Sequence, residues 1–221
     1  MADAEPRHLP RLYLLTPALG DAAGFAPLLE AALDGGDVAS VLLLLATRDE
    51  GEAKKIVKSL APMIQQRGAA LLLADDPQLA ARASADGVHI RGSGATLEQA
   101  LDDAIQRIKP ERIVGVGPLS TKHDAMTAAE RDLDYLLFGG PFPEARGMTL
   151  AGIIERVAWW SEIFTVPCIG YAHRLDDVAA LASAGADFIA LGEAVWSDPR
   201  GSAAAIRDAQ AALTFVAREG G

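Results

Sequence analysis

ALASAGADFIALGE (residues 180–193) ends a helix, turns at an aspartate and enters a short apolar strand. Two further segments have the same design: ARASADGVHIRG (81–92) and AAERDLDYLLFGG (128–140). A repeat of this kind is typical of a chain built from strand and helix units around a parallel sheet. The repeat therefore predicts an α/β fold.

Outward from these segments, short apolar runs alternate with longer amphipathic stretches. The runs predict eight strands, at 11–16, 38–46, 69–74, 87–90, 112–117, 134–139, 166–170 and 188–192. The stretches between them predict eight helices, near 24–34, 50–67, 77–84, 97–108, 121–131, 148–162, 175–183 and 200–217. Runs such as LLLLA (42–46) lack polar alternation, which is typical of parallel strands that are covered on both faces.

Eight strands and eight helices favour a single-domain (β/α)8 TIM barrel over an open doubly wound sheet. No G-x-G-x-x-G follows a predicted strand, so a dinucleotide-binding sheet lacks its main support. No linker divides the chain, and we expect one barrel domain over 11–221 after a flexible leader at 1–10. Asp86, Asp134 and Asp187 each precede a strand, which assigns them to the structural end of the barrel.

Composition excludes several classes of function. The chain has 221 residues, of which 30 are acidic and 20 basic, so its net charge is −10. That charge opposes nucleic acid and anionic membrane surfaces, and we expect neither as a partner. The most apolar run, 38–46, is about half as long as a transmembrane helix. A lone cysteine, Cys168, excludes an internal disulfide and indicates a cytoplasmic protein, and its mid-strand place predicts an inert thiol.

Candidate site residues lie just after the strands, where barrel enzymes carry their chemistry. Gly139, Gly170 and Gly192 end predicted strands, where glycine either binds phosphate through its backbone or simply turns the chain. Asp75 and Asp76 form a carboxylate pair suited to Mg²⁺ with substrate phosphates. Asp76 also precedes a proline and equally fits a helix N-cap.

The histidines are weaker candidates for a functional site than these glycines and aspartates. His89 lies inside the predicted strand GVHI (87–90), and a histidine among apolar neighbours is more often a hydrogen-bonded core residue than a catalyst. The four histidines lack the spacing of metal ligands, so the sequence does not predict a zinc site.

The segment ADDPQLAARASADGVHI (74–90) resembles the thiamine phosphate synthase and thiazole tautomerase family, in which two aspartates, a helix and a Gly-Val-His-Leu strand occur in this order. Other segments match the family's strands in sequence: LYLLT (12–16), RIVGVG (112–117), DYLLFGGPFPEAR (134–146), VPCIG (166–170) and AGADFIALGEAVW (184–196). The resemblance spans nearly the whole chain. It is most specific in the ordered occurrence of ADD, GVHI and GGPFP.

The family synthase is a (β/α)8 barrel that joins a hydroxymethylpyrimidine diphosphate to a thiazole phosphate and releases diphosphate with Mg²⁺ present. The resemblance therefore implies a small phosphorylated heterocycle as ligand and a possible Mg²⁺ ion with Asp75 as its ligand. A homo-oligomer is possible, but the family's assembly does not carry over to this chain, whose exposed aromatic residues are few and scattered. It also implies candidate substrate- and phosphate-binding residues, namely Arg48, Arg146, Gly139, Gly170, Gly192 and His89.

Several of the family's polar ligands have other residue types here. The strand that carries Gln-x-Arg-x-Lys in the family reads VLLLLA (41–46), with Arg48 as a replacement a few residues later. The second metal aspartate falls at Gly94, and the lysine after the Phe-Pro turn becomes Arg146. Because cations stabilise a departing diphosphate, these changes weaken the expected site.

Three functions remain open on the sequence. The first is a divergent thiamine phosphate synthase with a degenerate diphosphate site. The second is a non-catalytic barrel of the same family that binds a small ligand or has a regulatory role. The third is a tautomerase-like isomerase, for which His123 is the histidine nearest to the expected position.

Overall fold

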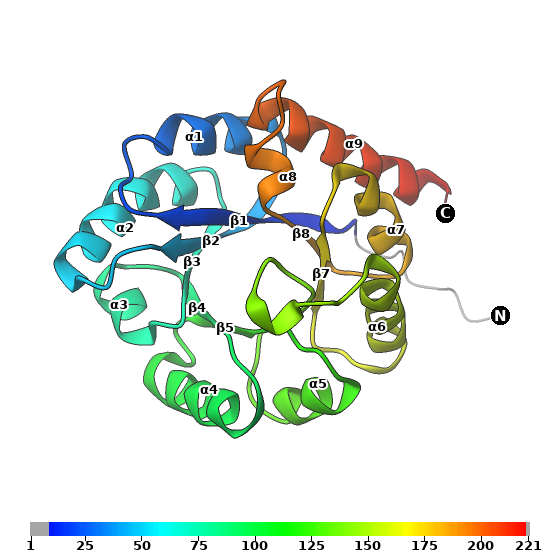
Figure 1. Cartoon of the computed structure of the whole chain (residues 1–221), viewed down its shortest axis with the longest axis horizontal. Helices are drawn as coiled ribbons and strands as arrows, with labels where there is room; N and C mark the ends of the chain where they lie inside the picture. The colour runs from blue at the N-terminus through cyan, green and yellow to red at the C-terminus, as the bar shows by residue number, and fades with distance from the viewer. Residues whose placement is uncertain (1–8, 220–221) are drawn as a thin grey trace.

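The computed structural model of the chain describes residues 9–219 and has eight parallel strands in a closed barrel, surrounded by helices (Figure 1). The predicted single-domain (β/α)8 barrel is confirmed. The strands are β1 (Arg11–Leu19), β2 (Val38–Leu45), β3 (Ala70–Ala74), β4 (Gly87–Ile90), β5 (Ile113–Val116), β6 (Tyr135–Phe138), β7 (Cys168–Ala172) and β8 (Phe188–Leu191). Most of the predicted leader at 1–10 lies outside the described residues.

The helices follow the strands in alternation. They are α1 (Ala26–Gly35), α2 (Glu50–Gln65), α3 (Pro77–Arg82), α4 (Gly94–Ile108), α5 (Lys122–Ala129), α6 (Leu150–Ile163), α7 (Val178–Ser183), α8 (Glu193–Trp196) and α9 (Ser202–Glu219). Two short 3₁₀ helices are η1 (Pro143–Ala145) and η2 (Leu175–Asp177). Within the described part of the chain, none of the helices is long and apolar enough to cross a membrane.

Strand β7 differs from the prediction, which placed it at 166–170. Pro167 has no N–H to give to a ladder, and pairing with β6 begins at Cys168. The strand then continues to Ala172, because Tyr171 turns its ring into the barrel and packs there. Gly170 is therefore inside the strand and not in the loop that follows it.

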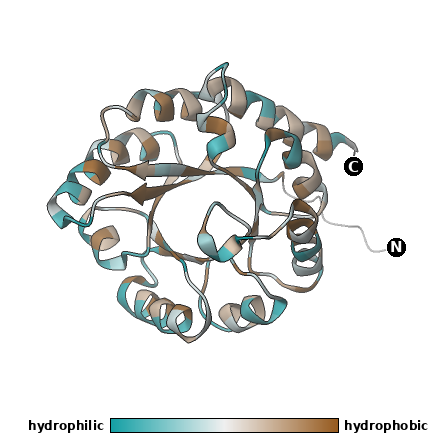
Figure 2. Cartoon of the chain, in the orientation of Figure 1, coloured by the Kyte–Doolittle hydropathy of each residue, from teal (hydrophilic) through white to brown (hydrophobic). Residues whose placement is uncertain are grey.

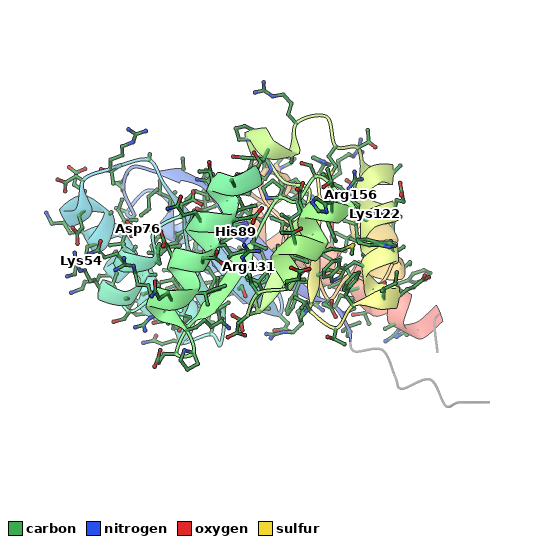
Figure 3. The ribbon with its side chains drawn as sticks, turned by 90° about the horizontal axis from the view of Figure 1, so that it is seen from below. Lys54, Asp76, His89, Lys122, Arg131 and Arg156 are labelled. Carbon is green, nitrogen blue, oxygen red and sulfur yellow. The ribbon has the colours of Figure 1, made fainter. Side chains whose placement is uncertain are left out.

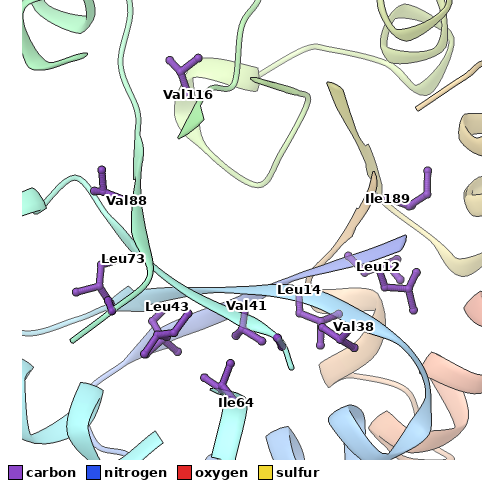
Figure 4. Packing of buried hydrophobic residues seen from close by; sticks show 14 of the residues in the cluster. Leu12, Leu14, Val38, Val41, Leu43, Ile64, Leu73, Val88, Val116 and Ile189 are labelled. Carbon is purple, nitrogen blue, oxygen red and sulfur yellow. The ribbon is translucent and has the colours of Figure 1, made fainter. Parts of the chain in front are cut away.

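The core has two layers, because alternate residues of each strand point to opposite faces of the sheet. The outer layer packs between the strands and the helices, and Figure 4 shows part of it around Leu14, Val41 and Leu73. The inner layer fills the barrel with side chains such as Tyr13 and Leu42. Figure 2 shows the resulting pattern, with brown strands inside a ring of helices that alternate brown and teal.

The three aspartates that precede β4, β6 and β8 fasten the barrel at the N-terminal ends of its strands. Each carboxylate accepts a hydrogen bond from a backbone N–H of the preceding strand. The pairs are Asp86 with Leu71 at 2.7 Å, Asp134 with Val114 at 2.7 Å, and Asp187 with Cys168 at 2.8 Å. Their predicted structural role is confirmed.

Candidate functional site

A cavity of about 680 Å³ opens at the C-terminal ends of β2, β3 and β4, the end of the barrel at which chemistry is expected. Its apolar wall includes Leu44 and Leu73. Its charged lining consists of two arginines and two carboxylates, Arg48, Arg91, Glu50 and Asp76. The loop that follows β6 contributes Phe142 to the same cavity and lies over the barrel opening in Figure 1.

The two carboxylates of this lining already have partners. Asp76 accepts a hydrogen bond from the Leu79 N–H at 2.8 Å and caps α3, so the N-cap interpretation of Asp76 is confirmed. Glu50 pairs with Arg82, at 2.7 Å between nitrogen and oxygen. Arg48, in contrast, has no carboxylate partner among residues 9–219, and its exposed side chain can meet a ligand.

Asp75, the predicted metal ligand, lies at the rim of β3 and forms an ion pair with Arg91. Its Oδ1 accepts the backbone N–H of Arg91 at 2.8 Å, and its Oδ2 accepts the Nε and Nη2 donors of the same guanidinium. Asp75 has φ = 59°, a left-handed conformation that is uncommon outside glycine but that aspartate tolerates. Its own N–H donates to the His89 carbonyl at 3.0 Å, which fixes this turn against β4.

The donor set does not fit the Mg²⁺ that the family resemblance implies. Three hydrogen bonds from Arg91 occupy the Asp75 carboxylate, and Asp76 is engaged as a helix cap. Residues 9–219 contain no cluster of three histidine, cysteine, aspartate or glutamate side chains that could hold a metal ion. A hard cation normally needs several oxygen ligands, and among the described residues the carboxylates nearest the predicted ligand already hold Arg91 or cap α3.

His89 lies in the interior of the barrel and is completely buried (Figure 3). Its Nε2 lies 3.0 Å from the Gly117 carbonyl, and its Nδ1 lies 3.0 Å from the Tyr135 hydroxyl. Burial lowers the pKa of His89 to about 4, so the ring is neutral near pH 7. Both ring nitrogens have protein partners, and the ring therefore offers no free donor to a phosphate in this arrangement.

The Gly117 carbonyl fixes the direction of a buried chain of hydrogen bonds. A carbonyl only accepts, so Nε2 carries the proton of the neutral ring and Nδ1 accepts from the Tyr135 hydroxyl. Tyr135 in turn accepts from the Tyr13 hydroxyl, 2.9 Å away. The chain runs from Tyr13 on β1 through Tyr135 on β6 to His89 on β4.

Phe142 separates this buried chain from the cavity. Its ring stacks over His89, with 6.4 Å between the ring centroids, and the Arg91 guanidinium lies 4.8 Å from the centroid of the Phe142 ring. The buried Phe142 thus closes the centre of the barrel mouth, and a ligand in the cavity would sit beside it, above β2 to β4.

The predicted glycine site is only partly assembled. Gly192 follows β8 at the mouth, and a Cβ added there would lie 3.1 Å from the Tyr171 hydroxyl. Gly139 follows β6 with φ = 80°, a conformation that favours glycine. Gly170 faces the helices instead, since a Cβ there would lie 3.0 Å from Leu181, so this glycine allows a close helix approach. The exposed Arg146 follows η1, outside the lining of the cavity.

The sequence interpretation missed Arg91 as a site residue. Asp75 is the first residue after β3 and Arg91 the first after β4, and these two strands are neighbours. Opposite charges at equivalent ends of adjacent parallel strands must meet, so this signal was present in the sequence. The partners of His89 were not predictable in the same way, because Tyr13 and Tyr135 lie on strands far apart in the chain.

The fold and the site define the class of the protein as a closed (β/α)8 barrel with a charged cavity at the C-terminal ends of its strands. Comparison with known proteins narrows this class. The family model described as thiamine monophosphate synthase matches residues 12–195. The chain belongs to this family.

Relatives and solved structures agree with this membership. The chain is 38% identical over 200 residues to a thiamine-phosphate synthase of Rhodospirillum centenum, covering 90% of this chain and 95% of the relative. It is 33% identical over 211 residues to a thiamine-phosphate synthase of Hyphomonas neptunium, covering 92% and 94%. The structure of thiamine phosphate pyrophosphorylase from Pyrococcus furiosus superposes with a TM-score of 0.76 at 23% identity, covering 95% and 98%, and supports the fold.

Proposed function

We propose that the protein is a thiamine-phosphate synthase, a transferase that joins a hydroxymethylpyrimidine diphosphate to a thiazole phosphate. The observation that carries this proposal is the match to named synthases along almost the full length of both chains. The position of the cavity supports it, because barrels of this class carry out their chemistry at the C-terminal strand ends.

The reaction requires few functional groups of the protein. A bond forms between the two heterocycles, the carbon–oxygen bond to diphosphate breaks, and diphosphate leaves with the bonding electron pair. The protein must hold the two substrates in line and stabilise the charge that develops on the leaving group. Arg48 and Arg91 line the cavity and can donate to phosphate oxygens.

The other substrate needs a second place at the mouth. We assign the thiazole phosphate to the side of β6 and β8, where Gly139 and Gly192 follow their strands. The Tyr171 hydroxyl lies next to Gly192 and has no hydrogen-bond partner within the described residues, so it can donate to this substrate. Both substrates are small phosphorylated heterocycles.

A second candidate is a barrel of this family that binds a small phosphorylated ligand without catalysis. The inward face of β2 favours it, because Leu42 and Leu44 fill a part of the barrel where the family carries polar diphosphate ligands. Apolar side chains cannot stabilise a departing diphosphate, although they can pack against a heterocyclic ring.

One assay with both substrates distinguishes the synthase from the non-catalytic binding barrel. Purified protein is mixed with the pyrimidine diphosphate and the thiazole phosphate, and release of diphosphate is followed over time. A synthase releases diphosphate only when both substrates are present, and Arg48→Gln slows the release. If the two substrates together give no turnover, but calorimetry detects thiazole phosphate binding, the binding barrel replaces the synthase.

A further inference from the structure

The Asp75–Arg91 ion pair is built into the rim of the cavity by the backbone. Strands β3 and β4 pair in parallel, with Ala74 opposite His89, so the residues that follow them emerge side by side. The Asp75 N–H donates to the His89 carbonyl at 3.0 Å, and the Arg91 N–H donates to the Asp75 carboxylate at 2.8 Å. These contacts hold both residues at this rim before any ligand arrives.

Two neighbours fix the guanidinium of Arg91, one along its edge and one against its planar face. Asp75 accepts two of its N–H donors along the edge, and the Phe142 ring packs against its face at 4.8 Å. A guanidinium has five N–H donors, so three remain, and none of them has an acceptor among residues 9–219. The side chain is 30% exposed and lines the cavity.

The geometry points to Arg91 as the resident cation of this cavity, which binds a phosphate group of the substrate directly and without a divalent metal ion. A fixed arginine with free donors suits phosphate, because its planar fork matches two phosphate oxygens at once. The inference rests on the proposed function for the substrate, a phosphorylated heterocycle. It adds the group that holds the phosphate and the absence of a metal requirement.

The charges around the cavity agree with this inference. The lining contains two arginines, Arg48 and Arg91, and two carboxylates, Glu50 and Asp76, so its formal charges cancel. The further carboxylate at the rim, Asp75, is paired with Arg91. A metal ion at Asp75 would also have to displace three hydrogen bonds from Arg91. Phosphate binding then depends on the direction of the arginine donors, not on a strongly positive field.

The test is calorimetric titration of the protein with inorganic phosphate, first with EDTA and then with Mg²⁺. We expect the dissociation constant to agree within about twofold between the two media. Arg91→Gln should weaken binding by about tenfold or more, as expected for a lost charge-assisted bond. The matched control is Arg11→Gln, which removes the bidentate Arg11–Asp37 pair at the opposite end of the barrel and should leave the affinity unchanged.

Two results would overturn the inference: phosphate binding that requires Mg²⁺, or a folded Arg91→Gln variant with the affinity of the parent protein. Circular dichroism verifies the fold, and Arg91→Lys decides the matter if the glutamine variant does not fold. Lysine keeps the charge but lacks the fork, so a severalfold loss is expected, and an unchanged affinity contradicts the inference.

Turnover in the same two media separates this inference from the proposed function. If neither medium supports turnover, while phosphate binding still depends on Arg91, the synthase proposal fails and Arg91 remains the phosphate ligand. If turnover occurs only with Mg²⁺ and is unaffected by Arg91→Gln, the synthase proposal holds and the inference fails.

Discussion

The hydroxyl of Tyr13 on β1 lies 2.9 Å from the hydroxyl of Tyr135 on β6, inside the closed barrel. This contact links strands that are not neighbours in the sheet, and it continues to His89 on β4. Burial raises the pKa of both tyrosines, so they act here as neutral hydrogen-bonding groups. A polar chain of this kind stabilises the barrel only while every member keeps its partner.

The direction of the chain predicts unequal effects of removing its two hydroxyl groups. Tyr13→Phe removes the terminal donor and should lower the free energy of unfolding by about 1 kcal/mol. Tyr135→Phe leaves both His89 Nδ1 and the Tyr13 hydroxyl without partners, and should cost about 2–3 kcal/mol. Urea unfolding measures both values, with Tyr171→Phe as the interior control. Equal losses would contradict the direction that the Gly117 carbonyl sets.

The buried His89 predicts a loss of stability in acid. Its pKa falls from 6.5 to about 4 on folding, so below pH 6.5 the unfolded chain binds a proton that the folded protein does not. Stability should therefore rise with pH between about 4 and 6.5, by about 3 kcal/mol in total. Urea unfolding at a series of pH values measures this rise.

Two histidine variants test the source of this dependence. His89→Gln should flatten the rise between about pH 4 and 6.5. His123→Gln, which changes an exposed histidine of α5, should retain it. A parent protein whose stability is constant across this interval would contradict the assignment of a neutral, buried imidazole.

Alanine at Gly170 should mainly lower stability, whereas alanine at Gly192 should mainly weaken phosphate binding. Gly170→Ala places a Cβ 3.0 Å from Leu181 and 3.3 Å from Val157, so it should lower stability by about 1–3 kcal/mol and leave phosphate affinity unchanged. Gly192→Ala meets only the Tyr171 hydroxyl at close range, and should lower stability less than Gly170→Ala does. Its Cβ crowds the Tyr171 hydroxyl at 3.1 Å and should weaken phosphate binding severalfold. Thermal unfolding measures the stability of both variants, and calorimetry with inorganic phosphate measures their affinity. If Gly170→Ala weakened phosphate binding and Gly192→Ala did not, the phosphate site would lie at β7.

The Cys168 thiol should be unreactive in the folded protein. Burial raises its pKa to about 12, so almost no thiolate is present near pH 7. A thiol-specific reagent should modify it at the rate of unfolding, and at once in concentrated urea. Rapid modification of the native protein would show that the start of β7 opens to solvent.

The sequence predicted the barrel because its local patterns agree with the global fold. The aspartate of each repeat ends a turn, and its carboxylate also accepts a hydrogen bond from the preceding strand. The same residue therefore marks the turn in the sequence and stabilises the barrel in the structure. The short turn α8 was missed, since its four residues have too little length to show a helical period.

The site was less predictable than the fold. Asp75, Arg48 and Gly192 were selected from their positions after strands, and they do lie at the mouth. The meeting of Asp75 and Arg91 follows from their places after neighbouring strands, and its signal was overlooked. The closure of the mouth by Phe142 depends on side-chain directions that neither periodicity nor spacing encodes. Whether the selected residues bind phosphate stays a prediction for the titrations above.

The aspartates at the N-terminal strand ends divide the ring into quarters. Each of them joins an even-numbered strand to the odd-numbered strand before it, and the Arg11–Asp37 pair does the same for β1 and β2. Among residues 9–219, the seams between quarters lack this fastening. Amide exchange in mild denaturant should therefore reveal modules of two strands each, which open one after another along these seams.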